Sequence, residues 1–263
     1  MSPFPIELVS MKFRDYIEQT HAFTNQQLVE GCALSKSSAK TTLRRAVEAG
    51  RIERVRRGLY VSKTGRFSVV SVDPFELVAA LDDEAIFSFH SALEAHGVAH
   101  NIGGTCQFRS ATVKGSFEYS GVTYVPLPVE EGLSTQKLRG KNGLRIAVTT
   151  REQTIVDCLN HPERCGGMEE ALMSVSLFPY IDADALLGLI AEGSASLAAR
   201  AGWLLEQKTK DWRISDDVLK ELGKLTDGGP YRLDKNSEKS QGWSRRWKLC
   251  LPASKEEVRN WVL

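Results

Sequence analysis

Apolar positions recur at helical spacing in two short segments near the start of the chain. Residues 11–20 and residues 25–31 each turn two or three apolar side chains toward one face, which predicts two amphipathic helices. Thr24 stands directly before the second segment and Gln27 follows three residues later, which is the arrangement of a capping box. Gly31 is expected to end this helix and to lead into a short turn.

A third helix is predicted from its N-cap Ser35 to Ala49, with Gly50 closing it. Small and aliphatic residues form a stripe along one side, which would pack this helix on the other two. The opposite side carries hydroxyl and basic groups of the kind that read base edges and bind phosphates in DNA. The candidate DNA contacts on this helix are Ser37, Ser38, Lys40, Thr41, Arg44 and Arg45.

Two short β segments follow within residues 51–61 and flank a turn at Arg57-Gly58, which predicts a hairpin. A hairpin directly after the third helix of such a unit is typical of the wing of a winged helix-turn-helix. Basic side chains on a wing would meet the phosphate backbone of DNA. The candidate contacts on the wing are Arg54, Arg56 and Arg57.

Helical and alternating patterns follow one another without a regular order after residue 66. Helices are predicted at residues 75–81 and 86–96, and a period of two over residues 105–125 predicts a small antiparallel sheet. This irregular order favours an α+β fold over a doubly wound sheet. The remaining predicted elements are a strand at 144–149, helices at 151–159, 168–175, 183–191, 197–207 and 216–225, and a final strand at 243–251.

The charge of the chain is divided unevenly. Residues 1–66 contain 12 Lys and Arg against 6 Asp and Glu, a net charge of +6, whereas residues 67–263 have a net charge of −5 within a total of +1. A basic module joined to a mildly acidic one suggests that the first part binds a polyanion. We therefore predict an α+β protein with a winged helix-turn-helix domain at 1–66 and a mixed α+β domain at 67–263.

We expect a protein of the cytoplasm without a membrane partner. The sequence has no run of about 18 apolar residues, the length needed to span a bilayer. Residues 1–10 lack the basic start and apolar stretch of a signal peptide. The five cysteines are scattered and odd in number, which favours reduced thiols over a disulfide framework.

Six short motifs occur in a characteristic order along the chain. They are RRGLYV at 56–61, FHSALEAHG at 89–97, VTTREQTIVDCL at 148–159, GGMEEA at 166–171, AGWLLE at 201–206 and RWKL at 246–249. Together they resemble the AbiE-type antitoxins, a family of transcriptional regulators of phage-defence loci. The resemblance runs from about residue 20 to residue 251.

The resemblance implies a repressor that binds double-stranded DNA at its own promoter, at repeated sites. It also implies that the C-terminal domain counters a cognate nucleotidyltransferase-like toxin encoded next door, by direct contact or otherwise. The alternative is a stand-alone winged-helix transcription factor whose second domain senses a small ligand. A toxin reading frame adjacent to this gene would favour the first interpretation.

We predict neither catalysis nor a bound metal or cofactor. Cys158, His161 and Cys165 lie close together in the sequence, but a structural zinc site needs four ligands and no second pair accompanies them. Glu152 and Asp157 lack a nucleophile or base beside them, so two carboxylates alone are weak evidence for acid–base chemistry.

The tail of the chain mixes basic and aromatic residues, a combination found on surfaces that bind nucleic acid. Trp247 is predicted to belong to the core. The basic side chains around it could form a second contact with DNA or an RNA-related partner, or face solvent in a hairpin. These candidates for a secondary contact are Arg245, Arg246 and Lys248.

Overall fold

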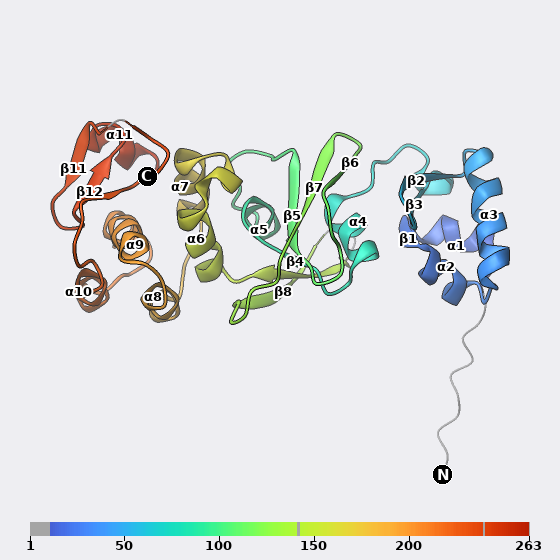
Figure 1. The fold of residues 1–263 in the computed structure, drawn as a ribbon, viewed down its shortest axis with the longest axis horizontal. Coiled ribbons are helices and arrows are strands. Elements are labelled where there is room, and N and C mark those ends of the chain that lie inside the picture. Colours follow the sequence, from blue (N-terminus) through green and yellow to red (C-terminus); the bar gives the residue numbers. More distant parts are fainter. Residues whose placement is uncertain (1–10, 141–142, 239, 263) are drawn as a thin grey trace, which may run out of the picture.

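The computed structural model describes residues 11–140, 143–238 and 240–262, and its parts lie in a row (Figure 1). A small unit of short helices and a hairpin forms one end, a sheet lies in the middle, and helices followed by a small β unit form the other end. The fold is α+β, as the sequence predicts. Within the described residues, no helix has both the length and the apolar character needed to cross a bilayer.

The first unit is the predicted winged helix-turn-helix. Thr24 and Gln27 form the capping box, with the Thr24 backbone N–H donating to Gln27 Oε1 over 2.7 Å, and the Ser35 hydroxyl accepts from the Ser38 backbone N–H. A short strand, β1, was not predicted, and it pairs with the hairpin to give the strand order β1-β3-β2. The elements are α1 (Phe13–Gln19), β1 (Ala22–Thr24), α2 (Asn25–Gly31), α3 (Lys36–Glu48), β2 (Ile52–Arg56) and β3 (Leu59–Ser62).

A mixed sheet forms the middle of the molecule, with strand order β6-β7-β5-β4-β9-β8. Strands β5 and β7 are parallel, as are β4 and β9, whereas the other neighbours are antiparallel. Side chains of the sheet and of the helix before it bury a common apolar cluster that includes Leu77, Phe87 and Phe108. The elements are η1 (Gly65–Phe67), α4 (Pro74–Leu81), β4 (Ile86–Phe87), α5 (His90–His96), β5 (Thr105–Arg109), β6 (Phe117–Tyr119), β7 (Val122–Leu127), β8 (Thr135–Arg139) and β9 (Arg145–Thr149).

Two predictions for this region are wrong. The helix predicted at 86–96 begins only at His90, because Ile86 and Phe87 pair with strands on both sides of them. The sheet predicted at 105–125 is not wholly antiparallel, because β5 and β7 run parallel and only β6 and β7 form a hairpin. Alternation along one strand reveals its two faces but not the direction of its neighbours, so the sequence pattern did not determine these pairings.

Helices that follow the sheet agree closely with their predicted ranges, and a small β unit ends the chain. The single strand predicted at 243–251 is wrong, because the chain turns over residues 245–248 and Lys248 has a φ of +48°. Two antiparallel strands lie on either side of this turn. The elements are α6 (Arg151–Asn160), η3 (Pro162–Cys165), α7 (Met168–Ser176), α8 (Ala183–Ala191), α9 (Ala195–Gln207), α10 (Asp216–Lys224), β10 (Tyr231–Arg232), β11 (Gly242–Ser244), β12 (Leu249–Leu251) and α11 (Lys255–Asn260).

Trp247 is fully buried, as predicted, and joins two motifs that are far apart in the sequence. Its indole N–H donates to Glu206 Oε2 on α9 over 3.0 Å, and Arg246 Nη1 lies 3.1 Å from Glu206 Oε1. A Cβ atom on Gly202 would stand 2.1–2.5 Å from carbons of the indole ring. Gly202 therefore leaves the space that Trp247 fills, which explains why the AGWLLE and RWKL motifs occur together.

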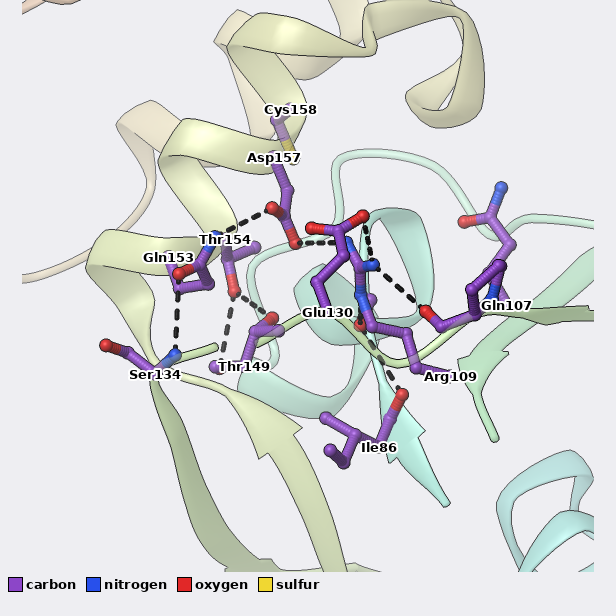
Figure 2. Close-up of polar contacts among 12 residues, drawn as sticks. Ile86, Gln107, Arg109, Glu130, Ser134, Thr149, Gln153, Thr154, Asp157 and Cys158 are labelled. Carbon is purple, nitrogen blue, oxygen red and sulfur yellow. Dashed lines mark hydrogen bonds and ion pairs between the residues drawn. The ribbon is translucent and has the colours of Figure 1, made fainter. Parts of the chain in front are cut away.

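A buried arginine connects the sheet to α6 (Figure 2). Arg109 on β5 is 2% exposed, and its Nε donates to Ser88 Oγ over 3.2 Å. Its Nη2 lies 3.7 Å from Asp157 Oδ2, and its Nη1 lies 2.6 Å from Glu130 Oε1. Gln153 donates to the other oxygen of Asp157 over 2.9 Å. Burial raises the pKa of Asp157 to about 6, and the nearby Arg109 opposes this rise.

We expect Asp157 to make stability depend on pH between about 4 and 6. Because its folded-state pKa is raised, its contribution is largest below the unfolded pKa and is lost as pH rises through the folded pKa. The free energy of unfolding contributed by Asp157 in the wild type should fall by about 2–3 kcal/mol as pH rises over this range. In Asp157→Asn this decline should be absent, and urea unfolding of both proteins measures it. The prediction is wrong if the variant and the wild type change in parallel over this range.

Candidate nucleic-acid interface

Helix α3 has one buried and one exposed face. Ala39, Leu43 and Ala46 are buried against α1 and α2, as the apolar stripe predicts. All six predicted contact residues on this helix are exposed. Arg44 Nε lies 3.8 Å from Glu48 Oε1, and both side chains are more than 60% exposed. An exposed ion pair of this length stabilises little, so the Arg44 guanidinium can leave it for another anion.

Two adjoining hollows join α3 to the wing, with volumes of about 690 and 730 Å³. Asn25, Lys40, Arg54 and Tyr60 line both hollows, which together form one groove. Four of the predicted residues of α3 and two of the wing lie in this groove. These residues are Lys40, Thr41 and Arg44, with Ser37 at the start of the helix, and Arg54 and Arg57 on the wing.

The groove carries more positive than negative charge. Lys36, Lys40, Arg44, Arg54 and Arg57 line it, against two carboxylates from α2 and α3. A concave basic surface next to an exposed helix is suited to a DNA duplex, because the helix can enter the major groove while basic side chains reach the phosphates. Among the residues that line this groove, Asn25, Lys36 and Tyr60 are not in the predicted set. The capping box at Thr24 could have indicated that Asn25 opens α2 beside the wing turn.

Arg56 does not share this groove, although it lies two residues after Arg54. Its guanidinium carbon stands 4.8 Å from the centroid of the Phe117 ring on β6. Of the other predicted residues, Ser38 interacts with the cap residue Ser35, and Arg45 is exposed on α3 but lines neither hollow. The predicted set therefore divides into residues that line the groove and residues that lie beside it.

The basic residues of the tail lie at the opposite end of the molecule from α3 (Figure 1). Arg246 is paired with Glu206, and Lys248 Nζ donates to the Thr226 carbonyl over 3.2 Å. Arg245 is exposed. The structure does not bring these side chains to the groove, so a secondary DNA contact there stays a prediction.

The three residues weighed as zinc ligands do not form a cluster. Cys158 and Cys165 are buried, and their Sγ atoms are 3.3 Å apart, whereas the imidazole of His161 lies 3.1 Å from Glu163 in an exposed position. Over the described parts of the chain, no three His, Cys, Asp or Glu side chains are grouped so that they could hold a metal ion.

Comparison with known proteins adds an independent observation on the winged unit. Residues 13–63 match the AbiEi antitoxin family of transcriptional regulators. The match begins at α1 and ends just after β3, so it includes every residue that lines the groove. It confirms the predicted family resemblance for this AbiEi-like unit, and it supports a DNA-binding regulator of antitoxin type.

The fold as a whole is similar to a known structure. The crystal structure of the RV2827C protein from Mycobacterium tuberculosis superposes with a TM-score of 0.62 and 15% sequence identity, covering 91% of this chain and 89% of that chain. At this identity the likeness shows the fold alone. No curated protein sequence matches the chain.

Proposed function

We propose that this protein is a transcriptional repressor and antitoxin that binds double-stranded DNA at repeated sites in its own promoter. The observation that carries the proposal is the basic groove between α3 and the wing. The match of residues 13–63 to a family of antitoxin regulators supports it, because these residues form the groove.

Helix α3 and the wing would make different kinds of contact with DNA. Helix α3 would enter the major groove, where Thr41 and Arg44 can donate to base edges. Arg54 and Arg57 on the wing would contact phosphates, which holds the protein on any sequence and releases counterions. Arg54 Nε already donates to the Arg56 carbonyl over 3.3 Å, which keeps its side chain at the edge of the groove.

Arg44→Ala is expected to reduce sequence preference by about 1–3 kcal/mol at the base pair that it reads. Arg57→Ala should instead weaken binding to all sequences alike and lower the salt slope of log K by about 0.9. Titrations of promoter and scrambled duplexes over a salt series measure both effects. Arg139→Ala on β8 is the control, because Arg139 is exposed and lies outside the groove. Equal losses by Arg44→Ala on both duplexes would show that α3 does not read the sequence.

The antitoxin half of the proposal places toxin antagonism in the part of the chain after the winged unit. A full-length variant with Arg44, Arg54 and Arg57 all replaced by Ala should lose promoter binding and still protect cells from the adjacent toxin. Growth under toxin induction compares wild type, this variant and an empty vector. If soluble wild-type protein fails to rescue growth while the toxin is active, the antitoxin assignment is wrong and only DNA binding stands.

An open polar pocket favours a second candidate function, a stand-alone regulator that senses a small polar ligand. The pocket has a volume of about 420 Å³, and His90, Gln107, Arg164 and Glu170 line it. His90 Nδ1 is buried there, 3.3 Å from Glu94 Oε1, and this carboxylate raises the pKa of His90. A metabolite that raises the Tm and changes promoter affinity, together with no growth rescue from the toxin, would favour this function over the antitoxin.

A further inference from the structure

The winged unit is attached to the middle of the molecule on two sides. On the first side, Leu59 and Val61 of the wing share an apolar cluster with α4. Gln27 Nε2 donates to the Ala80 carbonyl over 3.1 Å, and His21 Nδ1 lies 3.6 Å from Glu76. These contacts fix β1, β3 and the start of α2, and on the outer strand of the wing, β2, Val55 packs against the same cluster.

The β6–β7 hairpin supports the second side, where β2 runs. Phe117 and Tyr119 lie two residues apart on β6, so their side chains share one face of the strand. The Tyr119 hydroxyl donates to Glu53 Oε2 over 3.0 Å, and the Phe117 ring lies under the Arg56 guanidinium. Burial and then the Glu53 carboxylate raise the pKa of Tyr119 to about 12, so its hydroxyl keeps the proton that it donates.

The conformation of the β6–β7 hairpin is fixed by its turn and by the packing of its aromatic side chains. Ser120 and Gly121 form its two-residue turn, with φ values of +52° and +79°. Two positive φ values at such a turn match the twist of the flanking strands. The Phe117 ring also stacks on Tyr124 with centroids 4.6 Å apart and planes 4° from parallel, and Tyr124 is buried.

A β-bulge in the wing directs Arg56 to this hairpin. The register of β2 against β3 shifts between Arg54 and Arg56, so Val55 and Arg56 together face Leu59. Without the bulge, Arg54 and Arg56 would lie on the same face of β2. The extra residue moves Arg56 to the face that Val55 uses against the apolar cluster of the sheet. Arg54 stays at the groove.

The guanidinium of Arg56 is covered, unlike that of an exposed arginine that is free to bind a phosphate. Its Nη1 is buried and makes no hydrogen bond within the described residues, and the ring of Phe117 covers its guanidinium. A cation over an aromatic face is attracted by the ring quadrupole, and this attraction grows as water is excluded. Arg57, the next residue, is exposed at the turn and lines the groove.

We propose that the β6–β7 hairpin sets the position of the wing relative to α3, and that Arg56 is a positioning residue rather than a DNA contact. The proposal rests on the proposed DNA binding. Phe117 holds β2 through Arg56, and Tyr119 holds it through Glu53. The wing is thereby placed so that Arg54 and Arg57 can reach phosphates. The sheet of the middle unit thereby becomes part of the DNA-binding machinery without touching DNA.

The salt dependence of binding separates positioning from contact. Each phosphate contact that is lost lowers the slope of log K against log salt by about 0.9. A wing that is only less firmly held makes the same phosphate contacts once bound, so it loses affinity with little change in slope. Fluorescence anisotropy measures binding of the full-length protein to a promoter duplex over a salt series. The proteins compared are wild type, Arg54→Ala, Arg56→Ala, Phe117→Leu and Tyr119→Phe, with Arg139→Ala as control. We expect Arg54→Ala to lower the slope. Arg56→Ala and Phe117→Leu should each weaken binding about two- to tenfold at the wild-type slope.

The double variant Arg56→Ala/Phe117→Leu should bind about as well as either single variant, because both changes remove one interaction. Hydrogen exchange of the β2 amides should rise in Phe117→Leu and Tyr119→Phe while that of α3 is unchanged, which also shows that the variants are folded. If Arg56→Ala lowers the slope as Arg54→Ala does, and the Phe117 variant binds normally, the positioning role is overturned while DNA binding stands. If wild type shows no salt-dependent binding, the proposed function fails and the positioning role falls with it.

Discussion

Replacing Arg109 by alanine is expected to lower the free energy of unfolding by about 3–5 kcal/mol, because it leaves a buried carboxylate without its countercharge. Arg109 is 2% exposed and Asp157 is 7% exposed, so water cannot take the place of the guanidinium. The Asp157 oxygen that faces Arg109 accepts no hydrogen bond within the described chain. Urea unfolding at pH 7 measures the effect.

Two further variants test the reason for this loss. Glu130→Gln removes the other ion-pair partner of Arg109, but Glu130 is 65% exposed, so its loss should cost no more than about 1 kcal/mol. Adding Asp157→Asn to Arg109→Ala should recover part of the stability, because no unpaired charge then remains buried. A double variant that is less stable than Arg109→Ala would contradict the electrostatic explanation.

Gly202→Ala is expected to lower the free energy of unfolding by about 3 kcal/mol, at the upper end of the usual cost of overpacking. The added methyl group would stand 2.1–2.5 Å from ring carbons of Trp247, which is fully buried and hydrogen-bonded to Glu206. The ring therefore has to move out of its place between α9 and the small β unit. Thermal and urea unfolding, with near-ultraviolet circular dichroism as a report on the indole, measure the change.

Gly188→Ala is the matched control for this prediction. Gly188 lies inside α8, it is exposed, and a Cβ atom there would meet nothing within 4 Å. Alanine should stabilise that helix by up to about 1 kcal/mol, since glycine is the poorer helix former. If Gly202→Ala is as stable as Gly188→Ala, the indole does not occupy the position that the structure gives it.

The domain boundary at residue 66 remains a proposal. Contacts that cross this boundary affect the choice between a fragment and the full-length protein for testing DNA binding. Phe67 stacks on His21 with ring centroids 4.3 Å apart, and Leu59 and Val61 are buried in a cluster shared with α4. A fragment that ends at residue 66 would lack Phe67 and would expose these apolar side chains. Full-length variants in the groove are therefore the sharper test of DNA binding.

The sequence by itself determined the local structure of the winged unit. Thr24 and Ser35 cap α2 and α3 because a side-chain oxygen can accept from the free N–H groups of a helix start, whatever surrounds it. The spacing of apolar residues along α3 placed Thr41 and Arg44 on the exposed face. The turn at Gly58, with a φ of +84°, fixed the position of the hairpin.

Only the tertiary structure decided which of these residues share a surface. Strict alternation would put Arg54 and Arg56 together, but the bulge at Val55 separates them, and it depends on pairing with β3 and packing on the sheet. Ile86 and Phe87 became a strand because partners were available on both sides, against a helical pattern. Local rules act through neighbours in the chain, whereas register, strand direction and burial depend on partners distant in sequence.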